Sequence, residues 1–233
     1  MDTVRAAFRD ECARLEGVLR DLDAVDLDRP TPCPPWAVRD LLAHVRTGAG
    51  RLVGMLAAPA PERAEVDAAG YFGAAKFAPE VDRDRIDGAR REARELPGVP
   101  EVAEGFARAW RAADAAVAAA PSGRLVRTRH GDAMALTEFL RTRVVEVAVH
   151  GLDLADALDR RPWLTPTAAA VVADLLAGGG PGPGEPAAGR PVPDELGWDA
   201  LTLVRKATGR VPLTSAERAV LDRTGWRWLS FGG

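Results

Sequence analysis

The sequence contains little of what characterises several large classes of protein. Its 233 residues include two cysteines, Cys12 and Cys33, which are too few for a disulfide framework in a chain of this size. No apolar run approaches the roughly 18–20 uncharged residues that a transmembrane helix needs. The N-terminus has neither the basic region nor the apolar core of a signal peptide. We therefore predict a cytoplasmic protein that does not enter a membrane.

Concentrated positive charge and nucleotide-binding motifs are also missing. The 31 basic residues are balanced by 34 acidic ones, and no block of lysine or arginine stands out. A nucleic-acid partner is therefore not expected. There is no Gly-x-Ser-x-Gly, no Gly-x4-Gly-Lys and no dinucleotide fingerprint at a helix start. This argues against a serine hydrolase of the α/β type, a P-loop enzyme and a nucleotide-dependent dehydrogenase.

What the sequence does contain is helical periodicity. Apolar residues make up 47% of the chain, as in ordinary globular proteins, and many recur at spacings of three and four. Four strong helices are predicted over residues 2–23, 36–56, 100–120 and 136–158, with Pro35 in the first turn of the second. A charged helix is predicted over 83–96 and a short one over 71–77. Strand signals are sparse, with only residues 124–129 extended, so we predict a mainly α protein built as an up-down four-helix bundle.

The composition changes after Pro162. We predict a bundle domain over residues 1–160 and a mostly helical C-terminal extension over 161–233 that packs on it. A Gly/Pro-rich linker is expected at 178–193. Helices are expected at 166–177, 198–208 and 215–223, followed by an extended tail from Trp226 to Leu229.

The most informative segment is the predicted helix over 136–158. Arg143, Glu146, His150 and Asp153 fall within an arc of about 80° on this helix. The remaining surface is almost entirely apolar, which indicates that the helix is buried on all sides. Burying carboxylates and an imidazole costs several kcal/mol unless they pair or bind a metal. The polar stripe therefore predicts either a buried ion-pair network or a metal site.

A metal site needs a third protein ligand besides Glu146 and His150, which are four residues apart and share a helix face. His44 is the better candidate because it borders the apolar face of its helix, and Gly48, one turn later, leaves room beside it. His130 is expected to be an exposed loop residue. Trp36 could line the rim of a pocket. Cys33 has no base nearby in the sequence and is not expected to be a nucleophile.

Two segments resemble a known family. Residues 31–44, TPCPPWAVRDLLAH, and the pattern Arg143-x2-Glu146-x3-His150-x2-Asp153 resemble motifs of the mycothiol-dependent maleylpyruvate isomerase family, a branch of the DinB/YfiT-like metal-binding four-helix bundles. The resemblance covers residues 3–160. It implies that His44, Glu146 and His150 bind a divalent metal, typically zinc. That metal would hold the thiolate of mycothiol, a low-molecular-weight thiol cosubstrate, beside a small electrophile.

Several interpretations remain open at this level. The leading one is a metal-dependent enzyme that uses the thiol for S-transfer or thiol-assisted isomerisation. Arg143 and Asp153 would orient the ligands or contact an anionic substrate, unless they only form a buried ion pair or bind backbone. The alternatives are a metal-dependent hydrolase that uses bound water, and a non-catalytic metal-binding bundle.

Zinc suits the nitrogen and oxygen donors, as would iron, nickel or manganese. We expect a monomer or homodimer. Residues 165–233 lack the strand-rich pattern of the family's C-terminal domain, so the electrophile is not implied.

Overall fold

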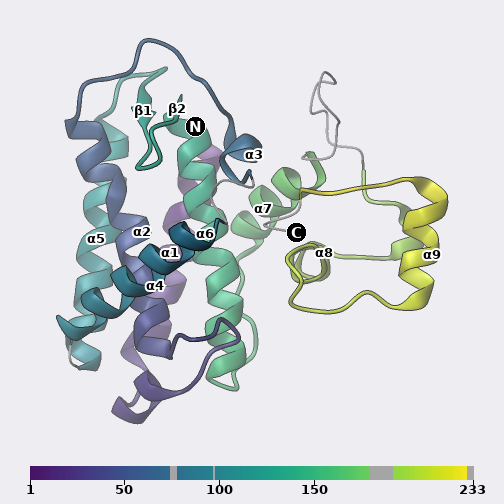
Figure 1. Ribbon diagram of the computed structural model, residues 1–233, viewed down its shortest axis with the longest axis horizontal. Coiled ribbons are helices and arrows are strands. Elements are labelled where there is room, and N and C mark those ends of the chain that lie inside the picture. Colours follow the sequence, from purple (N-terminus) through teal and green to yellow (C-terminus); the bar gives the residue numbers. More distant parts are fainter. Residues whose placement is uncertain (74–77, 97, 179–190, 230–233) are drawn as a thin grey trace.

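The computed structural model describes residues 1–73, 78–96, 98–178 and 191–229. The elements of the N-terminal part are α1 (Asp2–Arg20), the 3-10 turn η1 (Ala24–Asp28), α2 (Val38–Ala57), α3 (Ala68–Tyr71), α4 (Pro79–Arg94), α5 (Val99–Ala119), β1 (Leu125–Arg127), β2 (Ala133–Ala135) and α6 (Leu136–Ala157). Those of the C-terminal part are α7 (Pro166–Gly178), η3 (Asp194–Leu196), α8 (Ala200–Ala207) and α9 (Ser215–Thr224). Figure 1 shows their arrangement.

Four long helices form the bundle that the periodicity predicts. α1 and α2 each pack against both α5 and α6, and α4 lies along the outside of α2 (Figure 1). The stripe that includes Phe8, Leu15 and Leu19 faces the core, where each side chain is at most 1% exposed. Because an apolar stripe at this spacing can be buried along one face of a helix, the stripe fixes which side of α1 turns inward. The predicted mainly helical fold is confirmed.

α6 runs through the middle of the molecule. It contacts α1, α2 and α7, and its apolar residues are buried around most of its circumference. Arg143 and Asp153 are buried with them, at 4% and 1% exposure. The polar stripe on this helix is thus inside the protein, as the pattern predicts.

The start of α2 differs from the prediction. The helix begins at Val38, so Pro35 lies outside its first turn. The backbone N–H of Trp36 donates to Cys33 O at 3.0 Å, and the N–H of Thr31 donates to Trp36 O at 3.2 Å. These bonds hold residues 31–36 in a turn, and Asp40 then caps the helix by accepting from the N–H of Ala37 at 3.1 Å.

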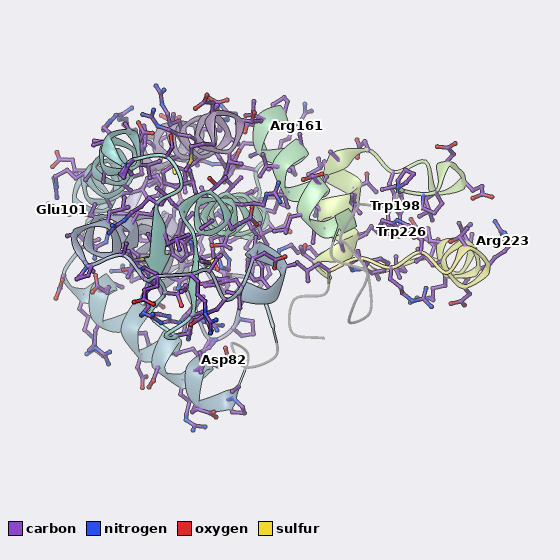
Figure 2. All side chains as sticks on the ribbon, turned by 90° about the horizontal axis from the view of Figure 1, so that it is seen from above. Asp82, Glu101, Arg161, Trp198, Arg223 and Trp226 are labelled. Atoms are coloured by element: carbon purple, nitrogen blue, oxygen red, sulfur yellow. The ribbon has the colours of Figure 1, made fainter. Side chains whose placement is uncertain are left out.

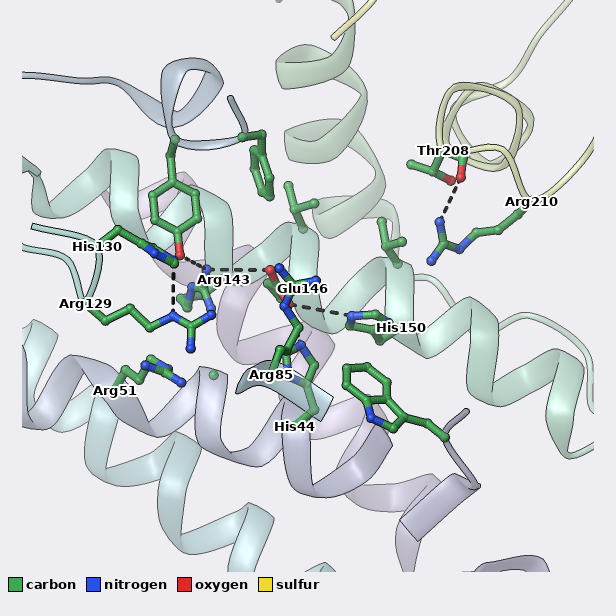
Figure 3. A pocket seen from close by; sticks show the side chains of 16 residues that line it. His44, Arg51, Arg85, Arg129, His130, Arg143, Glu146, His150, Thr208 and Arg210 are labelled. Carbon is green, nitrogen blue, oxygen red and sulfur yellow. Dashed lines mark hydrogen bonds and ion pairs between the residues drawn. The ribbon is translucent and has the colours of Figure 1, made fainter. Parts of the chain in front are cut away.

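A small hairpin connects α5 to α6. β1 was expected from the sequence, but its antiparallel partner β2 was not, because Ala-Met-Ala carries no alternation of apolar and polar residues. Gly131 in the connecting turn has φ +95°, a conformation that favours glycine. The turn carries Arg129 and His130 to the side of the bundle where α2 and α6 face each other (Figure 3).

The C-terminal extension begins with α7, which packs against α1 and α6, and α8 packs on α7. Figure 2 shows α9 at the end of the extension, away from the bundle, with Trp198 and Trp226 between them. Residues 226–229 follow α9 without regular secondary structure, and the N–H of Leu229 donates to Leu176 O at 2.8 Å.

Two predicted segments are only partly described. Residues 179–190 of the expected linker lie outside the described residues, as do residues 74–77 of the short helix expected over 71–77. The described part of that helix is α3, which ends at Tyr71. Within the described ranges, every helix is too short or too polar to cross a bilayer.

Candidate functional site

Three side chains from two helices meet on the inner face of the bundle. α2 supplies His44, and α6 supplies Glu146 and His150; we call these residues the triad. His44 Nε2 lies 3.3 Å from Glu146 Oε2, and His150 Nε2 lies 3.7 Å from the same oxygen. One potential ligand atom from each residue lies within 4.8 Å of the others. Residues separated by 102 positions in the sequence are thus brought to one point, where two imidazoles and a carboxylate form a donor set that suits a divalent cation.

Asp153 holds one of these imidazoles in place. Its Oδ2 lies 2.9 Å from His150 Nδ1. Burial opposes ionisation of Asp153, but hydrogen bonds from His150 and Arg210 outweigh it and hold the pKa of this carboxyl well below its ordinary value. An ionised carboxylate can only accept, so His150 donates from Nδ1 and presents Nε2 to the triad.

Arg143 lies beside the triad on α6. Its Nη2 is 3.8 Å from Glu146 Oε1 and donates to the Tyr71 hydroxyl at 3.2 Å. A methyl group at Gly48 would lie 3.2 Å from Arg143 Nη1, so the absence of a side chain there leaves space for the guanidinium. Arg143 therefore pairs with Glu146 and Tyr71 and does not form the ion pair with Asp153 that the sequence left open. The carboxylate of Asp153 pairs with Arg210.

The charge state of the triad suits cation binding. Burial disfavours the charged form of Glu146, but the hydrogen bond with His44 and the charge of Arg143 outweigh it, so the pKa of Glu146 lies well below its ordinary value. Burial lowers the pKa of His44 in spite of its contact with Glu146. At neutral pH the triad therefore offers an anionic carboxylate and a neutral His44 imidazole, the forms that coordinate metals.

Cys33 also lies near this point. Its Sγ donates to Asp153 Oδ2 at 3.2 Å, and Cys33, His150 and Asp153 form a second group of potential ligands. Burial and the charge of Asp153 raise the pKa of Cys33 to about 12. Because the thiolate is the form that attacks and coordinates, this thiol is a poor nucleophile and a poor ligand at neutral pH.

A cavity of about 260 Å³ opens beside the triad (Figure 3). Trp36 forms part of its wall, with its ring centroid 4.8 Å from that of His44. The C-terminal extension contributes Thr208 and Arg210. The cationic side chains that line the cavity are Arg51, Arg85, Arg129, Arg143 and Arg210.

Some of these lining residues were not expected. His130 was predicted to be exposed, but it is half-buried, lines the cavity and stacks edge-to-face on Tyr71 with centroids 6.2 Å apart. The fold of the β1–β2 turn causes this difference. Arg51 could have been noticed, because it lies seven residues after His44 and therefore on the same face of α2. Arg129 lies in a turn, and no periodic signal in the sequence indicates where it points.

The comparisons with known proteins agree with this architecture. Residues 8–155 match the family described as the mycothiol maleylpyruvate isomerase N-terminal domain. The crystal structure of the mycothiol-dependent maleylpyruvate isomerase aligns with a TM-score of 0.53 at 15% identity, covering 76% of this chain and 69% of the other. A histidine-to-alanine mutant of that isomerase aligns over the same shares, with a TM-score of 0.51 at 14% identity. No curated protein sequence matches the chain.

The fold defines the class of protein: a DinB-like four-helix bundle with a helical C-terminal extension. The family match spans more than half of the sequence. The chain belongs to the mycothiol maleylpyruvate isomerase N-terminal domain family.

Proposed function

We propose that this protein is a divalent-metal-dependent enzyme that uses a low-molecular-weight thiol, mycothiol, to attack a small electrophile in the cytoplasm. The observation that carries the proposal is the triad, whose donor atoms lie within 4.8 Å of one another at the wall of a cavity of about 260 Å³. A purely structural metal site is closed, whereas a catalytic one keeps a position open toward a substrate. The cavity beside the triad favours the catalytic alternative.

The residues present fit a divalent metal. His44, Glu146 and His150 would hold it, and the Nδ1 bond from His150 to Asp153 already presents the correct nitrogen. Two nitrogens and one oxygen suit zinc. A cation in this place supplies the positive charge that keeps a thiol ionised at neutral pH, since an unperturbed thiol has a pKa of about 8.5.

The protein's own residues would then position the reactants. Each triad side chain is only 17–23% exposed, so the reacting sulfur would be largely shielded from water. Trp36 forms an apolar wall beside His44, and Arg143 sets the position of Glu146 from the other side. A thiol brought next to an activated carbon would add to it. Release of the thiol after bond rotation gives isomerisation, and retention gives S-transfer.

The cosubstrate and the reaction are inferred from the relatives. The two structural neighbours are named as a mycothiol-dependent maleylpyruvate isomerase. We extend the thiol dependence to this chain because His44 of one motif meets Glu146 and His150 of the other at the cavity, and Asp153 of the second motif holds His150. The cavity suits the thiol end of the cosubstrate together with a small substrate.

The first test measures metal content. We expect about one equivalent of a divalent metal in the purified wild-type protein and a large loss in His150→Ala. His130→Ala is the matched control, because it removes a cavity histidine outside the triad. Equal, substoichiometric metal in all three proteins would overturn the metal step.

The second test measures thiol chemistry. Metal-loaded protein is incubated with mycothiol and either maleylpyruvate or an epoxide, and both isomerised and conjugated products are quantified. We expect turnover that requires the thiol and is lost in His44→Ala. Turnover that proceeds equally without thiol would instead indicate a hydrolase that activates water. Metal binding with no turnover of either substrate would contradict the thiol-enzyme proposal.

A further inference from the structure

The C-terminal extension reaches α6 through the turn that ends α8. The N–H of Gly209 donates to Lys206 O at 3.2 Å, and the N–H of Arg210 donates to Arg205 O at 2.8 Å. Gly209 has φ +74°, a conformation that favours glycine. These are the features of a Schellman motif, which turns the chain sharply at a helix C-terminus. The motif places Arg210 directly after the turn, and Figure 3 shows its side chain extending toward the His150 end of the cavity.

The Arg210 guanidinium is held between its own backbone and a carboxylate of α6. Nη1 donates to Thr208 O at 2.9 Å. Nε and Nη2 donate to Asp153 Oδ1 and Oδ2 at 2.9 and 2.7 Å, so one planar fork binds both carboxylate oxygens. The two side chains are 18% and 1% exposed. Because an arginine fork orients a carboxylate as well as neutralising its charge, Arg210 fixes the orientation of Asp153.

Asp153 in turn holds one of the triad residues. Its Oδ2 lies 2.9 Å from His150 Nδ1 and accepts from Cys33 Sγ at 3.2 Å. A thiol is a weak donor, so Cys33 contributes little to the orientation of the carboxylate. The contacts thus run from the extension to the triad in two steps: Arg210 orients Asp153, and Asp153 orients the imidazole of His150.

Loss of Arg210 would have two opposite effects on a cation at the triad. A buried carboxylate without its cationic partner carries an uncompensated charge, and turning toward water relieves it. His150 would then be free to adopt other ring orientations and the other tautomer, which weakens metal binding. Loss of a positive charge would itself favour a cation, but solvent weakens this effect and other arginines of the extension share it. The orienting effect belongs to Arg210, because Arg205 pairs with Asp156 and not with Asp153.

We propose that Arg210 is a positioning residue for the metal site and that docking of the C-terminal extension on α6 is coupled to metal binding at the triad. The docked extension holds Asp153 and His150 in the orientation that binds the metal, and a metal on His150 favours the docked extension in return. Such coupling is reciprocal, so both effects have the same factor. The inference rests on the metal step of the proposed function and is independent of the thiol chemistry.

Zinc affinity, measured by competition against a chromogenic chelator, tests the coupling. We expect Arg210→Gln to weaken zinc binding about tenfold or more, as is typical when a group that orients a metal ligand is removed. Arg210→Lys should lie between this variant and the wild type, because it keeps the charge but not the fork. It also decides the question if the glutamine variant fails to fold. Wild-type affinity in Arg210→Lys and Arg210→Gln would overturn the proposal.

The matched control is Arg205→Gln. Arg205 lies on α8 and pairs with Asp156 of α6 at 3.3 Å, so its replacement removes the same charge and also breaks a contact between the extension and α6. Zinc binding should not weaken in this variant. A loss as large as that in Arg210→Gln would show that the effect is a general consequence of loosening the extension, and would contradict the role of Arg210.

A double-mutant cycle tests whether Arg210 acts through Asp153. In the Asp153→Asn background, Arg210→Gln should produce little further loss of zinc affinity, because the carboxylate that it orients is already gone. A residue that only stabilised the fold would lower zinc affinity by the same factor in both backgrounds. Equal factors would therefore overturn the proposed line of contacts.

Amide hydrogen exchange tests the reciprocal effect in the full chain. The N–H groups of Arg210 and Val211 both donate to Arg205 O, so their exchange reports opening of the turn. Saturating zinc should slow their exchange about tenfold or more in the wild type and in Arg205→Gln, but much less in Arg210→Gln. Equal slowing by zinc in all three proteins would contradict the coupling.

These measurements separate the inference from the proposed function. A wild-type protein that binds no zinc at the triad would end the metal step and the coupling together. Zinc binding that is unaffected by the Arg210 variants would end the coupling alone. Zinc binding without turnover of any electrophile would contradict the thiol enzyme, while zinc affinity and hydrogen exchange still decide the coupling.

Discussion

At the scale of single residues, Asp153 connects three separate parts of the molecule. Its Oδ2 is 2.9 Å from His150 Nδ1 and accepts from Cys33 Sγ at 3.2 Å. Both its oxygens accept from Arg210, at 2.9 and 2.7 Å. One carboxylate therefore links the triad, the turn before α2 and the C-terminal extension.

The first prediction concerns this carboxylate. Asp153→Asn should lower zinc affinity about 10–100-fold, because the amide no longer holds His150 in the required tautomer with a full negative charge. A competition titration against a chromogenic chelator measures the change. Asp156→Asn is the control, since Asp156 is also on α6 and also pairs with an extension residue, Arg205, at 3.3 Å. Equal zinc affinity in the two variants would contradict the role assigned to Asp153.

Individual site residues could be predicted from the sequence to different degrees. The burial of the polar stripe on α6 could be predicted because apolar residues occupy most of the rest of the helix. A polar residue on such a helix is expected to be inside the protein and therefore to have a partner there. His44 followed from there being only three histidines in the chain. The pairing of Asp153 with Arg210 could not be predicted, because the path of the chain from α8 back to α6 is set by tertiary packing.

At the scale of helices, Glu16 joins α1 to α5. Its side chain is 3% exposed and accepts from Trp110 Nε1 at 2.9 Å and from Arg111 Nη2 at 2.8 Å. We predict that Glu16→Ala lowers the free energy of unfolding by about 2–3 kcal/mol, because the buried indole N–H loses its acceptor. Glu104→Ala, which removes an exposed pair with Arg108, should cost less than about 0.5 kcal/mol. Urea unfolding followed by circular dichroism measures the free energy of unfolding of both variants. Equal losses in the two would contradict the stabilising role of Glu16 between α1 and α5.

A second helix contact makes stability depend on pH. Burial raises the pKa of Glu11, although the hydrogen bonds from Thr165 oppose the shift. A carboxyl with a higher pKa in the folded state binds protons more tightly when folded. Its contribution to the free energy of unfolding therefore falls as pH rises from the unfolded pKa, about 4.3, through the folded value.

Glu11→Gln removes this titration. We predict a flatter dependence of the free energy of unfolding on pH in this variant, compared by urea unfolding at about pH 4 and about pH 7. Glu104→Gln, on the exposed face of α5, is the control and should keep the wild-type slope. An unchanged slope in Glu11→Gln would show that Glu11 does not titrate as its environment indicates.

The helices themselves were predictable because their apolar stripes are long. α1 ends at Arg20 and not at residue 23, because residues 24–28 form a separate 3-10 turn. The Asp26 side chain caps the start of this turn by accepting from the N–H of Asp23 at 3.0 Å. Such side-chain capping decides where a helix or turn begins and ends, but it leaves the spacing of apolar residues unchanged, so the spacing alone does not locate these ends. β2 is three residues long, too short for any alternation to be recognised.

At the scale of the whole molecule, the triad links helices that are far apart in the chain. α2 and α6 contribute ligands separated by 102 positions, so a cation bound there would stabilise only the folded state. We predict that zinc at roughly 100 times its Kd raises the unfolding free energy by about 2.7 kcal/mol and Tm by about 5–10 °C.

Differential scanning calorimetry measures this shift. His44→Ala and His150→Ala should lose it, whereas His130→Ala should retain it, because His130 lines the cavity but lies outside the triad. A shift that persists in both triad variants would place the bound cation elsewhere.

The position of Trp36 gives the molecule an optical property. Its indole lies 4.8 Å from His44 and 6.4 Å from His150, between ring centroids, and is nearly buried. Indole fluorescence is quenched by contact with imidazolium and by open-shell ions such as Ni²⁺ or Cu²⁺. The fluorescence intensity of Trp36 should therefore decrease when Ni²⁺ or Cu²⁺ binds to the triad, and Trp36→Phe should abolish this decrease. The fluorescence of Trp36 therefore reports whether the triad holds such an ion.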